Sequence, residues 1–248
     1  MNIQRGGRIA LAIFLTAFLP ADFTAGVYAA QTGGAERHVT ARPGSAAQDP
    51  DKNLLLQAGQ LYDRKKYDEA RNMLLPLAQK GNADASFALG LMEARGDLGR
   101  PDYVKAREWW EKAAQKGHPE AEYNLGLIYY RGVQQGGDGT DPAKRDFAET
   151  LEWWNKAAEH GHITAMYSLA GMARTGEGQP KNMRLAASWY TRAAKLGHPE
   201  AQYQLGSMYL NGAGVEKNLA EAKTWMQQAA EAGHPGAVSA MKMLDNIK

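Results

Sequence analysis

The chain has no cysteine and almost no excess charge of either sign. Without cysteine it cannot form a disulfide, a thiolate metal site, a catalytic thiol or a lipid-modified cysteine. Its 29 Lys and Arg residues and 27 Asp and Glu residues give a formal net charge of +2 over 248 residues. Because nucleic-acid binding needs a clustered excess of Lys and Arg, this composition argues against a nucleic-acid partner.

The sequence also lacks the patterns that mark common enzyme sites. No Ser-His-Asp order, P-loop or dinucleotide-binding glycine pattern occurs in a suitable structural context. The acidic residues fall on polar helix faces, where a solvated carboxylate is the usual state. We therefore expect a protein that is not an enzyme, with no catalytic residue and no cofactor.

An apolar run near the N-terminus is too short to span a membrane. The segment IALAIFLTAFL, which follows Arg5 and Arg8, is about half of the ~20 residues that a spanning helix needs. Val27 and Ala29 then complete the pattern of a secretory signal peptide over residues 1–29. We expect cleavage after Ala29, no membrane span in the mature chain, and a periplasmic or secreted protein. An uncleaved anchor is the alternative.

Residues 30–50 have few large apolar side chains and many Gly, Ala, Pro and polar residues. Such a segment cannot bury enough surface to fold, so we expect a flexible tether. The folded part of the chain is therefore expected over residues 51–248.

The folded part repeats one motif. The run WWEKAAQKGHPEA begins at Trp109, and variants of it begin at Trp153, Trp189 and Trp225. The glycine within this run recurs, from Gly81 onward, at steps of 36, 44, 36 and 36 residues. A fixed period of this size is typical of a solenoid of stacked helical units. The long step indicates an eight-residue insertion in one loop.

Equivalent positions in the copies predict two helices in each unit. Apolar residues at i, i+4 and i+7, such as Ala121, Leu125 and Ile128, form the buried stripe of a first helix. A glycine ends that helix, and an Asp or Asn caps the second helix. These positions are Gly96, Gly132, Gly176 and Gly212, and Asp102, Asp146, Asn182 and Asn218. Glu149 and Glu221 predict capping boxes.

Two further positions are expected to control packing. A small residue follows the Leu of each first helix and lets the partner helix approach, at Gly90, Gly126, Ala170 and Gly206. The first aromatic of each pair in the second helix is expected to fill the space between hairpins, at Trp109, Trp153, Trp189 and Trp225. The sequence therefore predicts an all-α fold, an α/α solenoid of stacked antiparallel helical hairpins.

This pattern resembles the Sel-one-like repeat, a relative of the tetratricopeptide repeat. The matching elements are A-x-Y-x-L-G at residues 121–126, the Asp or Asn cap, the W-W/Y-x-K-A-A run and G-H-P-E-A. The predicted units are a degenerate hairpin at 53–82, repeats at 83–118, 119–162, 163–198 and 199–234, and a capping helix at 235–248. The resemblance implies a right-handed superhelix that acts as a scaffold in bacterial envelope regulation, envelope assembly or host interaction.

One histidine recurs in each unit and has two interpretations. His118, His162, His198 and His234 occupy the position of Asn82. As metal ligands they would lie about 10 Å apart in successive repeats, too far to share an ion. The asparagine favours the second interpretation, a residue at the junction of two helices. The insertion at residues 134–141 contains GGDGTD but lacks the bidentate Glu of a calcium loop, so we expect a surface loop there.

The resemblance implies that the first helices line a concave face, where a partner protein binds. The residues that point there are Glu120, Tyr123, Tyr130, Arg131, Thr164, Tyr167, Arg174, Glu200, Tyr203, Leu210 and Asn211. The tyrosines at 123, 167 and 203 have an alternative role as half-buried parts of the repeat, because Phe87 shares their position. Positions that vary between copies are the stronger candidates for specificity, namely Tyr130, Arg131, Arg174 and Leu210.

Three functions stay open at this point. The first is an exported, non-catalytic adaptor that binds another protein through the concave face. The second is a cell-wall hydrolase or a protein that binds β-lactams or muropeptides, which a resemblance to cysteine-rich Sel-one-like proteins implies and the absence of cysteine argues against. The third is a structural spacer within an envelope complex.

Overall fold

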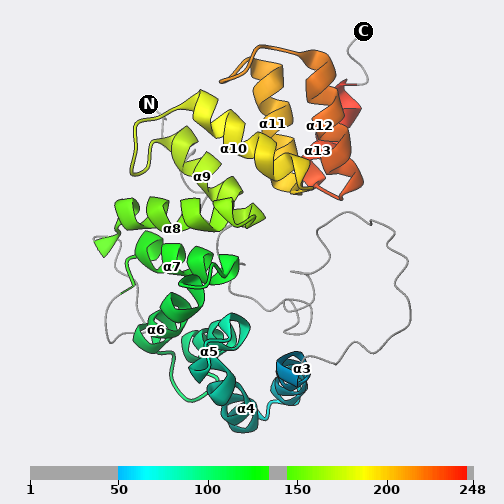
Figure 1. Ribbon diagram of the computed structural model, residues 1–248. Helices are drawn as coiled ribbons and strands as arrows, with labels where there is room; N and C mark the ends of the chain where they lie inside the picture. The colour runs from blue at the N-terminus through cyan, green and yellow to red at the C-terminus, as the bar shows by residue number, and fades with distance from the viewer. Residues whose placement is uncertain (1–49, 134–143, 245–248) are drawn as a thin grey trace, which may run out of the picture. The chain divides into compact units, whose positions relative to one another are not determined.

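The computed structural model describes residues 50–133 and 144–244, and every regular element in these ranges is an α-helix (Figure 1). The all-α prediction is therefore confirmed. The predicted signal peptide, the predicted tether apart from Pro50, and the predicted insertion lie outside the described residues. The described residues divide into two units, one ending at Leu77 and one beginning at Ala78.

The N-terminal unit contains α3 (Pro50–Asp63) and most of α4 (Tyr67–Gln79). Together the two helices span residues 50–79, close to the degenerate hairpin predicted at residues 53–82. Pro76 lies inside α4, and the helix continues to Gln79. The rings of Tyr62 and Tyr67, which lie at the adjoining ends of the two helices, are 5.1 Å apart.

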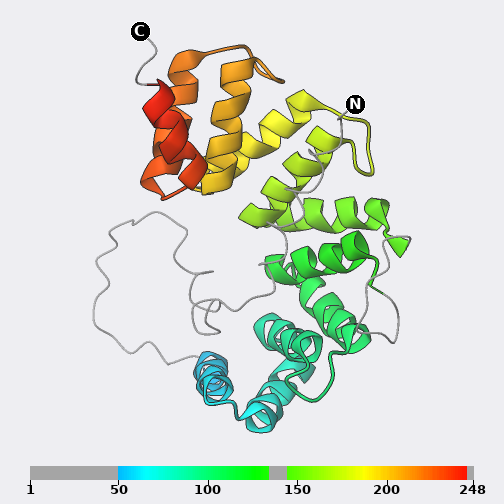
Figure 2. The same cartoon turned by 180° about the vertical axis from the view of Figure 1, so that it is seen from behind.

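The second unit contains four helical hairpins and one further helix in its described residues. They are α5 (Ala83–Arg95), α6 (Tyr103–Ala114), α7 (Pro119–Arg131), α8 (Phe147–Glu159), α9 (Ile163–Thr175), α10 (Met183–Lys195), α11 (Pro199–Asn211), α12 (Leu219–Glu231) and α13 (Pro235–Leu244). Each first helix packs on the second helix of its hairpin, and each second helix packs on the first helix of the next hairpin. Figures 1 and 2 show these helices in chain order, each beside the next. The chain therefore forms a solenoid in which each hairpin buries the apolar stripe of its neighbour.

The predicted caps are present in all four hairpins. The first helices end at glycines with φ between 64° and 87°, at Gly96, Gly132, Gly176 and Gly212. Glycine adopts this left-handed conformation without the steric penalty of a Cβ. The side chains that accept backbone N–H groups at the start of the second helices belong to Asp102, Asp146, Asn182 and Asn218.

The reciprocal capping boxes predicted at Glu149 and Glu221 are both wrong. The backbone N–H of Asp146, which Glu149 would engage, donates to the carbonyl oxygen of Tyr129. The carboxylate of Glu221 accepts the indole N–H of Trp225, at 3.0 Å. The backbone N–H of Asn218, which a capping box would engage, donates instead to the carbonyl oxygen of Tyr209. This backbone bond closes the hairpin, so the glutamate is not needed at the cap.

The second aromatic of each pair, and not the first, fills the core. Trp110, Trp154 and Tyr190 are at most 1% exposed, and Met226 at the same position is 2% exposed. The first members are only half-buried, at Trp109, Trp153, Trp189 and Trp225. The prediction for the first members is therefore wrong. The buried stripe of each second helix runs i, i+4, i+7, and a shift of one residue turns the side chain by about 100° around the helix.

The small residue after each Leu makes room for this buried side chain, as predicted. A Cβ at Gly126 would collide with the indole of Trp154, and a Cβ at Gly206 would lie 2.7 Å from Cγ of Met226. The indole N–H of Trp154 donates to the carbonyl oxygen of Tyr123 at 3.2 Å, which fixes the ring between the two helices. The paired positions are Gly90 with Trp110, Gly126 with Trp154, Ala170 with Tyr190 and Gly206 with Met226.

Candidate functional site

The recurring histidine is a helix N-cap. Its Nδ1 accepts the backbone N–H three residues later, at 3.0–3.3 Å, in His118, His162, His198 and His234. The side chain of Asn82 accepts from Ala85 in the same way, at 2.9 Å. Because the cap uses the lone pair on this nitrogen, the junction interpretation is confirmed. Within residues 50–133 and 144–244, no three His, Asp or Glu side chains are grouped closely enough to hold a metal ion.

Each capping histidine also stacks on an aromatic ring of the preceding hairpin. The ring centroids lie 4.4–4.8 Å apart in the pairs Phe87–His118, Tyr123–His162, Tyr167–His198 and Tyr203–His234. Tyr123 is only 6% exposed, so it lies inside the array and has little surface for a partner. The other two tyrosines of this position are half-buried. Tyr123, Tyr167 and Tyr203 therefore take part in packing between neighbouring hairpins, which is the alternative role considered for them from the sequence.

Burial keeps two of these histidines neutral. It lowers the pKa of His162 from the ordinary value of 6.5 to about 4, and a nearby His118 adds to the effect. Burial also lowers the pKa of His198. A neutral ring leaves Nδ1 free of a proton, which is the form that accepts the capping N–H.

Tyr130 lies in a polar and aromatic cluster that joins two hairpins. Its hydroxyl donates to Glu177, in the loop after α9, at 3.1 Å. Its ring centroid lies 5.2 Å from that of Trp154 and 5.9 Å from that of Phe147, and the guanidinium of Arg145 lies 5.5 Å from it. Burial and the Glu177 carboxylate raise the pKa of Tyr130 to about 12. Sequence comparison missed Glu177 because this position, which directly follows the glycine that ends each first helix, reads Asp97, Val133, Glu177 and Ala213 in the four repeats and so shows no constant pattern.

The remaining predicted residues form a surface with half-buried and exposed side chains. We call this surface the first-helix face; it consists of Glu120, Tyr130, Arg131, Thr164, Tyr167, Arg174, Glu200, Tyr203, Leu210 and Asn211. Glu120 and Glu200 lie in the first turns of α7 and α11, while Arg131 and Arg174 lie in the last turns of α7 and α9. Acidic residues near helix N-termini and basic residues near C-termini both stabilise the helix dipole.

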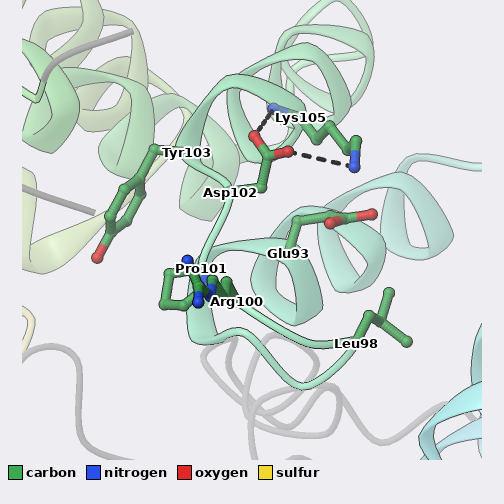
Figure 3. Close-up of a pocket in the computed structure, with 7 residues that line it drawn as sticks. All are labelled: Glu93, Leu98, Arg100, Pro101, Asp102, Tyr103 and Lys105. Carbon is green, nitrogen blue, oxygen red and sulfur yellow. Dashed lines mark hydrogen bonds and ion pairs between the residues drawn. The ribbon is translucent and has the colours of Figure 1, made fainter. Parts of the chain in front are cut away.

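A hollow of about 400 Å³ opens where α5 is joined to α6. Figure 3 shows its lining, which consists of Glu93, Leu98, Arg100, Pro101, Asp102, Tyr103 and Lys105. Oδ2 of Asp102 lies 3.2 Å from Nζ of Lys105, and the backbone N–H of Lys105 lowers the pKa of the Asp102 carboxyl. A hollow of about 410 Å³ occurs at the same junction of the next hairpin, lined in part by Tyr129 and Asp146. These hollows follow from the repeat, and no residue of the first-helix face lines either one.

The described part of the chain contains no helix with both the length and the hydropathy needed to cross a membrane.

The chain matches the Sel1 repeat family over four consecutive segments, residues 83–118, 119–162, 163–198 and 199–234. A Sel1 repeat protein from Oxalobacter formigenes is 32% identical, with 71% of this chain and 48% of that chain covered and a TM-score of 0.63. The protective antigen c5321 of uropathogenic Escherichia coli is 25% identical, with 79% of this chain and 49% of that chain covered and a TM-score of 0.46. The chain thus spans about half the length of these two proteins. No curated protein sequence matches it significantly.

Proposed function

Because the chain belongs to the Sel1 repeat family, whose members generally act as scaffolds for protein–protein interaction, we propose that it is a non-catalytic adaptor that binds another protein. The first-helix face is the proposed binding surface, and it corresponds to the concave face of tetratricopeptide-like solenoids. The pattern of an N-terminal signal peptide extends the proposal to an exported protein of the bacterial envelope. Its role there is regulation, assembly or host interaction.

One observation carries this proposal: the first helices keep one apolar stripe nearly constant, whereas an accessible position differs between repeats. The apolar stripe holds Ala, Leu and Met or Ile in the four full repeats, and a glycine ends each of these helices. One accessible position, in contrast, reads Tyr130, Arg174 and Leu210 in successive repeats. A constant frame with a variable surface is how a solenoid obtains specificity for one partner.

The chemistry of the first-helix face also suits a protein partner. It combines Tyr167 and Tyr203 with Arg131 and Arg174, and Tyr and Arg are the residue types most enriched at energetically important interface positions. The tyrosines are held by stacking on the next histidine. A side chain that is already ordered loses less conformational entropy on binding than a free one.

Capture of the partner from intact cells tests the proposal. The full chain with a C-terminal tag is crosslinked in cells and purified, and co-purifying proteins are quantified by mass spectrometry. The test variant is Arg131→Ala/Arg174→Ala/Asn211→Ala, which leaves Tyr130 in place because that residue joins two hairpins. The matched control is Glu108→Ala/Glu152→Ala/Ser188→Ala, at one exposed position of α6, α8 and α10.

Loss of one stoichiometric protein in the test variant, and its retention in the control, is the expected result. Equal capture by both variants would show that the first-helix face is not the binding surface. Recovery of the chain alone, or with glycan fragments only, would favour a cell-wall ligand over a protein partner. Circular dichroism on each purified variant checks that its helicity is unchanged.

Export is tested separately by cell fractionation. We expect the mature chain in the periplasmic or culture fraction, with Ala30 at its N-terminus. A full-length chain in the membrane fraction would identify an uncleaved anchor instead.

A further inference from the structure

Gly171 is a mid-helix glycine that packing within the chain does not explain. It lies in α9, and a Cβ at this position would have no atom within 4 Å. The mid-helix glycines of the other first helices differ, because a Cβ there would collide with or crowd the second helix, at Gly90, Gly126 and Gly206. The residue of α9 that is equivalent to these three glycines is Ala170, one residue before Gly171. Since glycine weakens a helix relative to alanine, Gly171 calls for a reason outside the fold.

Arg174 lies one turn after Gly171 on the same face of α9. Its side chain is half-buried, and its Nε is buried without a hydrogen-bond partner. Across residues 50–133 and 144–244, no Asp or Glu carboxylate forms an ion pair with it. Arg174 lowers the pKa of the Tyr167 and Tyr190 hydroxyls, in Tyr190 partly through a hydrogen bond between the two side chains. Burial outweighs this effect and raises the pKa of both tyrosines. Arg174 therefore forms no ion pair within the described residues.

Two acidic residues that follow Arg174 in the chain, Glu177 and Glu200, form no ion pair with it. Glu177 accepts the hydroxyl of Tyr130. Glu200, in the first turn of α11, raises the pKa of the Tyr167 hydroxyl, on which Arg174 has the opposite effect. Helix α9 itself has no acidic residue in its first turn, whereas α5, α7 and α11 each have one or more. Thr164 stands where these helices have Asp84, Glu120 and Glu200. Among α5, α7, α9 and α11, only α9 therefore has a basic residue in its last turn and no acidic residue in its first turn.

We propose that an extended acidic segment of the partner protein crosses α9, with its main chain against Gly171 and one carboxylate on Arg174. The inference rests on the proposed adaptor function and names the chemistry that this part of the first-helix face recognises. A missing Cβ allows the close approach of another main chain. A guanidinium offers two parallel N–H donors to one carboxylate, and such a pair is stronger than a neutral hydrogen bond.

The spacing of the two residues suits one extended segment. Three residues of an α-helix rise by about 4.5 Å, so Gly171 and Arg174 are separated by little more than one residue of an extended chain. A main chain in contact at Gly171 therefore places the next or second-next side chain over Arg174. Tyr167 lies one turn before Gly171 and provides an apolar wall for the same segment.

Site-specific photo-crosslinking in the full chain tests this inference. The crosslinking residue replaces Thr175, an exposed residue on the same side of α9, and a control replaces Ser188, which is exposed on α10. Adducts are digested and mapped to the partner's sequence. Each crosslinking chain also carries one of four substitutions, Gly171→Leu, Gly171→Ser, Arg174→Leu or Arg174→Lys. Three of these four replacements already occur at the equivalent positions of other first helices. Leu127 and Ser207 correspond to position 171, and Leu210 corresponds to position 174.

We expect an adduct from position 175 that maps to a segment rich in Asp or Glu. Gly171→Leu and Arg174→Leu should each reduce its yield about tenfold. Gly171→Ser, which adds a small side chain, and Arg174→Lys, which keeps the charge but loses the paired donors, should each reduce it by less. An adduct that maps to a neutral or basic segment, or that is indifferent to Arg174→Leu, would overturn the inference and leave the adaptor function standing. If the crosslinker gives no protein adduct at Thr175, beside the first-helix face, or at Asn211, within it, the proposed function itself fails. Thermal melting of each variant confirms that the array is folded.

Discussion

Nδ1 of His160 lies 2.8 Å from Oε2 of Glu122, whose side chain is only 2% exposed. Glu122 lies in α7 and His160 directly after α8, so the pair joins the two helices of one hairpin. In the next repeat, Met166 and Leu196 occupy the equivalent positions. The same two positions of the fold therefore hold either a buried carboxylate with its donor or two apolar side chains.

We predict that His160→Leu destabilises the protein by about 1–3 kcal/mol, because it leaves the buried Glu122 carboxylate without its partner. The double variant Glu122→Met/His160→Leu should recover this loss, since it reproduces the pair at Met166 and Leu196. Urea unfolding at pH 7 of the two single variants and the double variant measures the coupling. A single His160→Leu variant as stable as the parent chain would show that the pair contributes nothing.

The cap at His162 predicts a loss of stability in mild acid. Burial lowers the pKa of His162 to about 4 in the folded protein, whereas the unfolded chain takes up the proton near pH 6.5. The neutral form therefore stabilises the fold fully above pH 6.5, and this contribution is lost as the pH falls toward 4. It is on the order of 3 kcal/mol.

His162→Asn should flatten this dependence, because Asn82 shows that asparagine caps the same junction and it does not titrate. The measurement is the free energy of unfolding at several pH values between 4 and 7, for the parent chain and the variant. Parallel curves for the two proteins would contradict the prediction. Comparison of the two curves removes the contribution of the carboxyl groups, which titrate in both.

The contact between Gly126 and Trp154 predicts a size limit at the hairpin interface. Gly126→Ala should destabilise the protein by about 1–3 kcal/mol, because the new methyl group would overlap the indole. Trp154→Tyr in the same chain should recover part of the loss, as Ala170 and Tyr190 coexist at the equivalent positions. A double-mutant cycle measures the coupling, and independent, additive effects would argue against the contact.

The two members of each aromatic pair should differ in their effect on stability. Trp154→Ala should cost about 3–5 kcal/mol, because it empties a site in the core. Trp153→Ala should cost no more than about 1 kcal/mol, since the ring is half-buried and Lys156 lies over it at 4.3 Å. Thermal unfolding of both variants checks the order. A larger loss from Trp153→Ala would restore the original sequence-based assignment.

Gly171→Ala should make the isolated protein more stable. The added methyl group meets no atom within 4 Å, so the gain in helix propensity of about 0.5–1 kcal/mol has no steric penalty to offset it. Urea unfolding of the purified chain measures the change. A destabilised variant would mean that a neighbour closes over this position in solution.

Most of the fold could be predicted from the sequence because its determinants are local. The glycine after each first helix, the Asp or Asn before each second helix and the periodic apolar residues each act within one or two helical turns. Comparison of the copies strengthened each assignment, since a cap or stripe that recurs at a fixed step is not accidental. The partner of Arg174 could not be predicted, because a variable surface position carries no pattern to compare.

The sequence by itself determined the helical hairpins, their caps and the period of the array, all of which depend on residues close together in the chain. Only the tertiary structure decided which aromatic of each pair is buried, because a turn of about 100° around the helix separates two equally apolar choices. Only it brought Glu177 to Tyr130 and each capping histidine onto the tyrosine or phenylalanine of the preceding hairpin. These contacts depend on how neighbouring helices pack, and side-chain packing across 31 or more residues of chain leaves no local signal in the sequence.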